Sequence, residues 1–71
     1  MKIYSVCVGH YKDLKESKKD EKLIRDFGLQ IYLFKLGNEY TFKVLTTPIQ
    51  DKALMVETAL KQRHFDAFIS D

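Results

Sequence analysis

A chain of 71 residues can build one modest hydrophobic core, because a domain of this size buries only about 60% of the surface that its unfolded form exposes. Three glycines and one proline exclude linker-like and collagen-like chains, and the spread of apolar residues along the sequence predicts a folded domain. The formal net charge of +2 lacks the single-sign excess of a protein that binds mainly to nucleic-acid phosphates or anionic lipids.

The first half of the sequence predicts a strand, a helix and a second strand. Residues 3–9 alternate apolar with small side chains, as a half-buried strand does. Charged residues dominate 12–26, so the helix predicted there is regular only in its last two turns. Gly28 is expected to terminate this helix, because glycine adopts the left-handed conformation without a steric penalty. The strongly apolar residues 29–35 predict the second strand.

The second half predicts a third strand, a helix and a fourth strand. Gly37-Asn38 indicates a tight hairpin turn before a strand at residues 40–45, and the chain closes with a strand at residues 65–69. Between these strands, Thr47-Pro48-Ile49-Gln50 combines an N-cap threonine, a proline at the first helical position and a glutamine three residues after the cap. Ile49, Ala53, Val56 and Leu60 then form the apolar face of a helix that should run to about His64.

The two halves of the chain match each other. Residues 1–35 and 37–71 align without a gap and both predict β-α-β, which indicates an internal duplication in which Phe68 corresponds to Tyr32. The order β-α-β-β-α-β with a tight central hairpin most simply folds as a four-stranded antiparallel sheet with both helices on one face, an α+β fold of the ferredoxin-like kind. We therefore predict a single domain, residues 1–71, whose sheet leaves one face open.

Burial of apolar side chains is the main favourable contribution to the folding free energy of so small a domain. The helices should therefore cover the side of each strand that carries the apolar side chains. The side chains expected to face the helices are Tyr4, Val6, Val8, Leu29, Ile31, Leu33, Tyr40, Phe42, Val44, Phe65, Ala67 and Ile69. The side chains expected on the open face are Ser5, Cys7, Gln30, Tyr32, Phe34, Thr41, Lys43, Asp66, Phe68 and Ser70.

Three aromatic residues on the open face, Tyr32, Phe34 and Phe68, indicate a contact surface, since exposed apolar patches on soluble domains usually mark binding sites. Their flat rings suit stacking on a sugar ring or a nucleic-acid base. The alternative is that a dimer partner or a missing segment of a longer protein covers them, or that a twisted terminal strand turns them inward.

Nucleic-acid binding is not expected. An RNA-recognition module shares this fold but carries its stacking aromatics on the first and third strands. The outward residues of those strands here are Ser5, Cys7, Thr41 and Lys43. The lysines between residues 12 and 22 alternate with acidic residues and indicate a solvated helix face, with a weak contact to an anionic polymer such as teichoic acid as the alternative.

Enzyme activity, metal ions and cofactors are not expected either. Cys7 and His10 bring a thiol near an imidazole, but no third group to orient the histidine is apparent. Cys7, His10 and His64 lack the paired close spacing of structural zinc sites. A single cysteine also cannot form a disulfide within the chain.

No membrane contact by this segment is expected, because no apolar run approaches the roughly 20 residues that a spanning helix needs. Residues 1–8 are too short and too alternating for a signal-peptide core. The chain is then either a free-standing small protein or a domain of a longer exported one.

Two strand motifs, Tyr4-Ser5-Val6-Cys7-Val8-Gly9 and Tyr40-Thr41-Phe42-Lys43-Val44, are each followed by a helix and a closing strand. With Ala53, Leu60 and Phe65-Asp66-Ala67-Phe68-Ile69, they resemble the sporulation-related repeat, or SPOR domain, over the whole chain. The sequence departs from the family pattern at Cys7, where a polar glutamine is common, and at Leu45, where the second repeat often has glycine.

The SPOR resemblance implies the fold predicted above and non-catalytic binding of bacterial cell-wall peptidoglycan, typically glycan strands that lack stem peptides, across the exposed side of the sheet. The candidate glycan-binding residues are Ser5, Cys7, Gln30, Tyr32, Phe34, Thr41, Lys43 and Phe68. It also implies an extracytoplasmic location in the bacterial cell envelope, where the domain directs a parent protein, such as a hydrolase or a cell-division protein, to the wall or septum. The alternative function is dimerisation or another protein–protein interaction through the same face.

Overall fold

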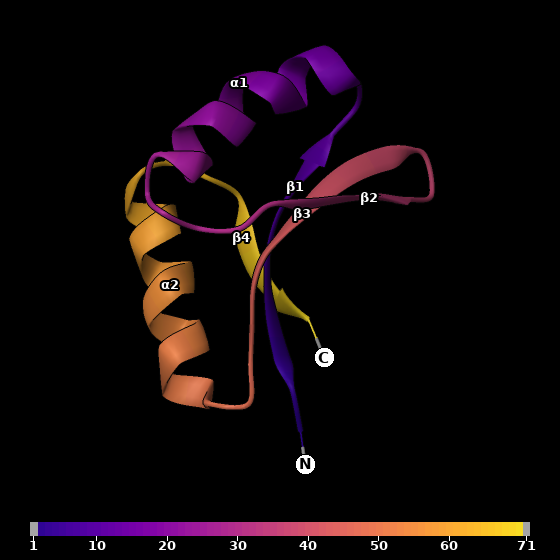
Figure 1. Cartoon of the computed structure of the whole chain (residues 1–71). Coiled ribbons are helices and arrows are strands. Elements are labelled where there is room, and N and C mark those ends of the chain that lie inside the picture. The colour runs from indigo at the N-terminus through magenta and orange to yellow at the C-terminus, as the bar shows by residue number, and fades with distance from the viewer. Residues whose placement is uncertain (1, 71) are drawn as a thin grey trace.

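The computed structural model describes residues 2–70, which fold in the order β-α-β-β-α-β (Figure 1). The elements are β1 (Tyr4–Tyr11), α1 (Leu14–Arg25), β2 (Tyr32–Leu36), β3 (Glu39–Thr47), α2 (Gln50–Gln62) and β4 (Ala67–Ser70). The strands form one antiparallel sheet in the order β2-β3-β1-β4, so β1 and β3 are central and β2 and β4 are the edges. The predicted α+β fold is confirmed.

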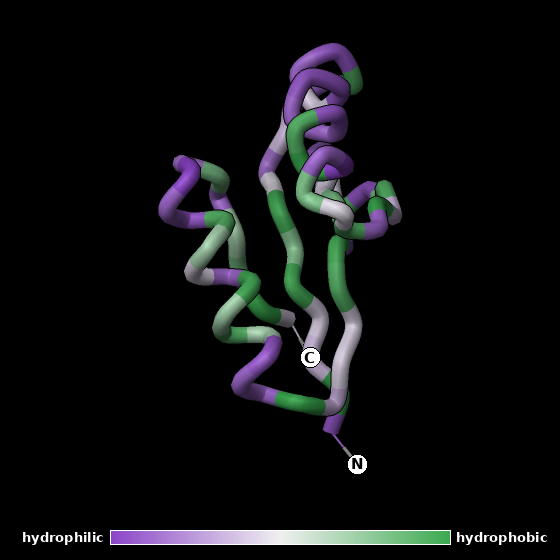
Figure 2. The backbone as a smooth tube through the Cα atoms, turned by 60° about the vertical axis from the view of Figure 1, so that its left-hand side comes forward, coloured by the Kyte–Doolittle hydropathy of each residue, from purple (hydrophilic) through white to green (hydrophobic). Residues whose placement is uncertain are grey.

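Both helices pack on the same face of the sheet, around one hydrophobic core. Ile24 of α1 and Leu60 of α2 are buried in the same cluster as Val6, Val8 and Phe42 of the central strands. Figure 2 shows the apolar segments of the strands beside a largely hydrophilic α1 and a mixed α2. Neither helix between residues 2 and 70 is long and apolar enough to cross a membrane.

Leu33 is the exception among the side chains predicted to face the helices. Leu33 lies on the predicted face of the sheet, because it pairs with the buried Phe42, yet its side chain is 39% exposed. Leu33 lies on the edge strand β2, in the hairpin that projects away from α2 (Figure 1). The helices therefore cover the centre of the sheet better than this edge.

A β-bulge interrupts the pairing of β1 with β3 near the start of β1. Val6 pairs with Leu45 and Cys7 pairs with Lys43, which leaves Val44 as the extra residue on β3. Val44 is buried, and the adjacent Leu45 also packs against the core. The third strand thus continues past the predicted end at residue 45, to Thr47.

A second bulge lies near the end of β1. Val8 pairs with Phe42 and Tyr11 pairs with Tyr40, so Gly9 and His10 together face a single residue of β3. The extra residue shifts the alternation of side chains by one position. Tyr11, rather than His10, therefore faces the helices and is buried in the core cluster. Because of this bulge, β1 extends two residues beyond the predicted end at residue 9.

Helix α1 is regular from its first turn, contrary to the prediction that only its last two turns would be. Asp13 caps the helix, and its carboxylate accepts a hydrogen bond of 2.8 Å from the backbone N–H of Glu16. Gly28 has a φ of 82° in the turn after the helix, which confirms its predicted role as terminator.

The face of α1 that meets the sheet is partly polar. Ser17 and Ile24 are buried, and the Tyr11 hydroxyl of β1 donates a hydrogen bond to the Asp20 carboxylate. These α1 residues lie on one face of the helix at three- and four-residue spacing. The other apolar residues around this helix, Leu14, Leu23 and Phe27, are exposed.

Helix α2 begins later than predicted, at Gln50. Thr47 is not its N-cap, because pairing with β1 holds Thr47 in the last position of β3. The Thr47 hydroxyl instead accepts a hydrogen bond of 3.1 Å from the N–H of Ile49, the residue that occupies the cap position. Pro48 thus precedes the helix. The end is close to the predicted one, with His64 at a φ of 70° in the turn that follows.

The hairpin and the edge strands complete the sheet. Gly37 has a φ of 62° at the first position of the two-residue turn between β2 and β3, which confirms the predicted hairpin. β2 begins at Tyr32 rather than at residue 29, and β4 begins at Ala67 rather than at residue 65. Residues 29–31 are coil, although Leu29 and Ile31 still pack against the core.

Candidate functional site

On the face of the sheet away from the helices, hereafter the open face, one row of side chains crosses all four strands. The register pairs Tyr32 with Lys43, Lys43 with Cys7, and Cys7 with Phe68. Directly paired residues share a face of the sheet, so the backbone fixes this row. Parallel to it, Phe34 pairs with Thr41. Aromatic residues therefore occupy the edge strands, and small residues occupy much of the centre.

The small residues at the centre of the open face are buried, although neither helix covers them. The exposed fraction is 7% for Ser5, 1% for Cys7 and 0% for Thr41. The half-buried Phe68 of the edge strand β4 provides part of the cover: its ring reaches over β1, where the Cε1 lies 3.5 Å from the position that a side chain on Gly9 would take. The open face thus has an aromatic surface above a floor of small side chains.

The aromatic rings form two groups at opposite edges. At β2, the ring centroids of Tyr32 and Phe34 are 6.5 Å apart, and the Lys43 Nζ lies 5.9 Å from the Phe34 centroid. At β4, the Phe68 ring stacks on the His10 imidazole at 5.2 Å, with an interplanar angle of 9°. Three inter-strand spacings, about 14 Å in all, separate the two edges.

His10 is a member of this surface that the sequence interpretation did not include. It was expected in a turn, whereas the second bulge keeps it within β1 and beside Phe68. The available signal was Gly9, because an isolated glycine inside a strand pattern indicates a bulge.

The Thr41 hydroxyl has no hydrogen-bond partner within residues 2–70, although it is buried. A Cβ on Gly9 would lie only 3.1 Å from the Thr41 Oγ1, so the absence of a side chain at Gly9 leaves room for this threonine. An unpaired buried hydroxyl lowers stability by about 1–3 kcal/mol. The open face is therefore not optimised for the stability of the isolated chain.

The Cys7 thiol is not arranged as a nucleophile. Burial raises its pKa above the ordinary value, and the positive charge of Lys43 opposes this rise only in part. The Sγ contacts the backbone carbonyl of Ser5 at 4.0 Å, whereas His10 stacks on Phe68. A thiol that remains protonated at neutral pH is a poor nucleophile.

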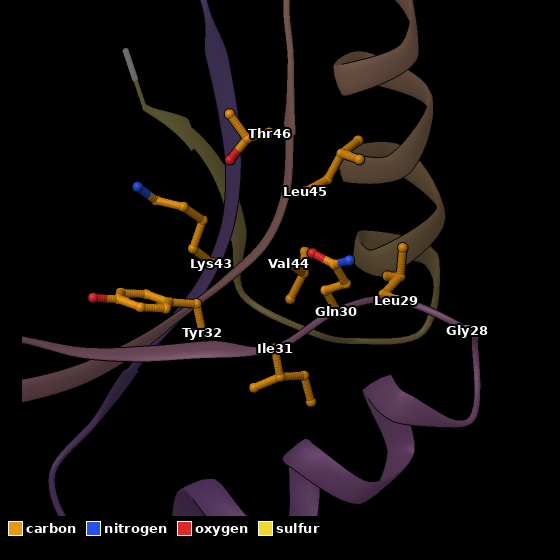
Figure 3. Close-up of a pocket in the computed structure, with 9 residues that line it drawn as sticks. All are labelled: Gly28, Leu29, Gln30, Ile31, Tyr32, Lys43, Val44, Leu45 and Thr46. Carbon is orange, nitrogen blue, oxygen red and sulfur yellow. The ribbon is translucent and has the colours of Figure 1, made fainter.

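Gln30 does not lie in the strand ladder with the other candidate residues. It belongs to the coil before β2 and lines a cavity of about 730 Å³ between this coil and β3. Figure 3 shows Tyr32 and Lys43 at one side of this cavity and Leu45 at the other, toward α2. Seven of the eight candidate residues therefore lie on the sheet, and the eighth lies in an adjoining cavity.

Comparison with solved structures finds a domain with the same fold. The chain matches the solution structure of the peptidoglycan-binding domain of CwlC, a cell wall lytic enzyme of B. subtilis, with a TM-score of 0.77 and 18% identity. The match covers 96% of this chain and 86% of that domain. No family model and no curated protein matches the sequence. The fold that the SPOR resemblance implied is therefore confirmed.

Proposed function

We propose that this chain is a non-catalytic module that binds the glycan strands of bacterial peptidoglycan across the open face of its sheet. The observation that carries the proposal is the placement of aromatic rings at both edges of this face, on Tyr32 and Phe34 at one edge and Phe68 at the other. The fold shared with the CwlC peptidoglycan-binding domain supports the same polymer as ligand.

The spacing of the rings favours an extended polymer over a small molecule. Aromatic groups about 14 Å apart can be contacted together only by a ligand that contains several linked sugar rings. Sugar rings present flat apolar faces that stack on aromatic side chains, and their hydroxyl groups match the Lys43 ammonium as a donor. A net charge of only +2 suits a ligand whose backbone is largely neutral.

The candidate residues then divide into two roles. Tyr32, Phe34, Lys43 and Phe68 retain exposed surface and contact the glycan directly. Ser5, Cys7 and Thr41 are buried and form the floor of the face, where Cys7 pairs with Phe68 and Thr41 pairs with Phe34. Such a module would hold a parent protein, such as a hydrolase or a division protein, at the wall or septum, on the outer side of the cytoplasmic membrane.

A sedimentation assay with purified peptidoglycan tests this function. The proteins to compare are wild type, Tyr32→Ala, Phe68→Ala, and Met55→Ala as a control from an exposed position of α2. We expect wild type and the control to bind equally, and each aromatic variant to bind about tenfold more weakly, the equivalent of about 1.4 kcal/mol.

Two results would overturn the proposal. One is that no protein binds peptidoglycan, or that all four bind equally. The other is that analytical ultracentrifugation finds a stable wild-type dimer that Tyr32→Ala and Phe68→Ala convert to monomer without any change in peptidoglycan binding. That second result would assign the open face to dimerisation instead.

A further inference from the structure

The lysines of helix α1 lie together on the side of the helix that points away from the sheet, hereafter the lysine face. Four exposed residues share this face at spacings of three and four positions: Lys15, Lys18, Lys19 and Lys22. The buried Ser17 and Ile24 lie two positions after the first and the last of these lysines, about 200° around the helix. The lysine face is therefore opposite to the face that packs on the sheet.

Most acidic side chains of this region are engaged elsewhere. The Asp13 carboxylate caps the helix, and the Asp20 carboxylate accepts a hydrogen bond from β1. Glu21 forms an ion pair with Arg25, with an oxygen–nitrogen distance of 3.7 Å. Three of the four acidic residues between positions 13 and 21 thus have partners away from the lysine face.

The other acidic residues of this region lie at the margins of the lysine face. Glu16 is beside it in the first turn, and Asp26 is at the C-cap. The four lysines form no ion pair within residues 2–70. The structure thus separates charges that alternate in the sequence. It creates a local excess of positive charge that the net charge of +2 conceals, because acidic residues of other elements cancel it in the sum.

These features favour a flexible, phosphate-bearing polymer as the ligand. Neighbouring positions on one helix face are about 5–6 Å apart at Cβ, so successive ammonium groups can meet successive phosphates of one chain. Helix α1 has no aromatic residue on which nucleic-acid bases could stack. Its exposed leucines, Leu14 and Leu23, lie on opposite flanks of the lysine face, so they do not form the continuous apolar face that a membrane-surface helix inserts into lipid.

We infer that the lysine face of α1 binds an anionic phosphodiester polymer of the cell wall, of the teichoic-acid kind. The choice of a wall polymer rests on the proposed function, which brings the chain to the wall. The two ligands do not compete, because α1 packs on one face of the sheet and the glycan lies on the other (Figure 1).

Titration of the chain with poly(glycerol phosphate), free of lipid and of glycan, tests this site. We expect wild type to bind with an affinity that falls about fiftyfold between about 50 and 200 mM salt, as for about four phosphate contacts to a flexible polyanion. Lys15→Gln/Lys19→Gln/Lys22→Gln should bind about tenfold more weakly at the lower salt concentration. This variant should bind peptidoglycan that lacks teichoic acid as wild type does.

The matched control is Lys35→Gln/Lys52→Gln/Lys61→Gln, which removes three exposed lysines of other elements and lowers the net charge equally. Glutamine and lysine have similar helix propensities, so both triple variants should keep the circular dichroism spectrum of wild type. The control should keep the affinity of wild type for poly(glycerol phosphate). Phe68→Ala should also keep it, although that variant binds peptidoglycan more weakly.

Three results would overturn the inference and leave the glycan proposal standing. One is that wild type does not bind poly(glycerol phosphate), or that both triple variants lose binding equally, which would show an effect of net charge alone. Another is tenfold tighter binding of an oligothymidylate with the same number of phosphates, which would reveal base contacts. The third is tighter binding of phosphatidylglycerol vesicles, which would assign the lysine face to a membrane surface.

The opposite combination separates the two proposals. If wild type binds poly(glycerol phosphate) through the lysine face but does not bind peptidoglycan that lacks teichoic acid, the glycan proposal is wrong and the inference about α1 stands.

Discussion

The two faces of this sheet use aromatic residues in opposite ways. On the helix-covered face, Phe42 is completely buried in a core shared by both helices. On the open face, Phe34 and Phe68 lie at the edges, half-buried, above smaller residues. Burial on the first face stabilises the fold, whereas the rings on the second retain surface that a ligand can cover. Position in the sheet, rather than residue type, decides which role a ring has.

The largest expected effect comes from a matched pair of substitutions across these faces. Phe42→Ala should lower the free energy of unfolding by about 3–5 kcal/mol, because it opens a cavity in the core. Phe34→Ala, on the adjacent strand but the opposite face, should lower it by only about 1–2 kcal/mol. Urea unfolding followed by circular dichroism measures both. Equal losses would contradict the division of roles between the two faces.

The hydrogen bond between Tyr11 and Asp20 is a polar link within the helix-covered side, and it is sensitive to pH. Burial, followed by the hydrogen bond and the negative charges of Asp20 and Asp66, raises the pKa of Tyr11 above its ordinary value. The folded state therefore favours the protonated phenol. This contribution to stability is fully present below about pH 10, the pKa of tyrosine in an unfolded chain, and is lost as the pH rises further.

Tyr11→Phe tests this link. The substitution should cost about 1–2 kcal/mol at neutral pH, because it leaves the Asp20 carboxylate without its donor. Thermal unfolding between pH 7 and 11 should show wild type losing its advantage over the variant above pH 10. Cys7 is present in both proteins, so any contribution of its thiol cancels. The difference between the two unfolding curves therefore reports the ionisation of the Tyr11 phenol. Parallel curves over the whole range would contradict the assignment.

A smaller effect of opposite sign is expected from the unpaired hydroxyl under the open face. Thr41→Val keeps the shape of the side chain and removes the orphan group, so it should raise the free energy of unfolding by about 1 kcal/mol. Thr47→Val is the matched control, since the buried Thr47 hydroxyl accepts a hydrogen bond from Ile49. It should lower the free energy of unfolding by a similar amount. Destabilisation by both variants would show that the Thr41 hydroxyl has a partner in solution.

The sequence was sufficient to predict the fold because its signals were local. Gly28 and Gly37 lie where the left-handed backbone is needed, and the alternation in β1 and β3 identifies the buried face. Helix α2 was predicted from an apolar repeat, and Ala53 and Leu60 of that repeat are buried. Its start was misplaced because the pairing of Thr47 with β1 is a long-range contact that no capping pattern reveals.

Helix α1 and the extent of the site were harder to predict. Ser17 meets the sheet as a small buried residue, and Asp20 meets it by accepting a hydrogen bond from Tyr11. Because both residues are polar, a search for apolar periodicity could not find them. The alternation of side chains along the strands predicted that Tyr32 and Phe68 share one face of the sheet. The strand register confirms this, because Tyr32 is linked to Phe68 through the paired residues Lys43 and Cys7. The bulge that brings His10 beside Phe68 depends on the pairing of β1 with β3.

The central claim is that a glycan strand lies on the open face, and NMR titration tests it most directly. Soluble peptidoglycan glycan fragments would be added to the ¹⁵N-labelled chain. We predict that the perturbed amide signals belong to the outward positions of all four strands, including Tyr32, Lys43, Cys7 and Phe68. Perturbation confined to α2, around the exposed Leu54 and Met55, or the absence of any perturbation, would contradict the account.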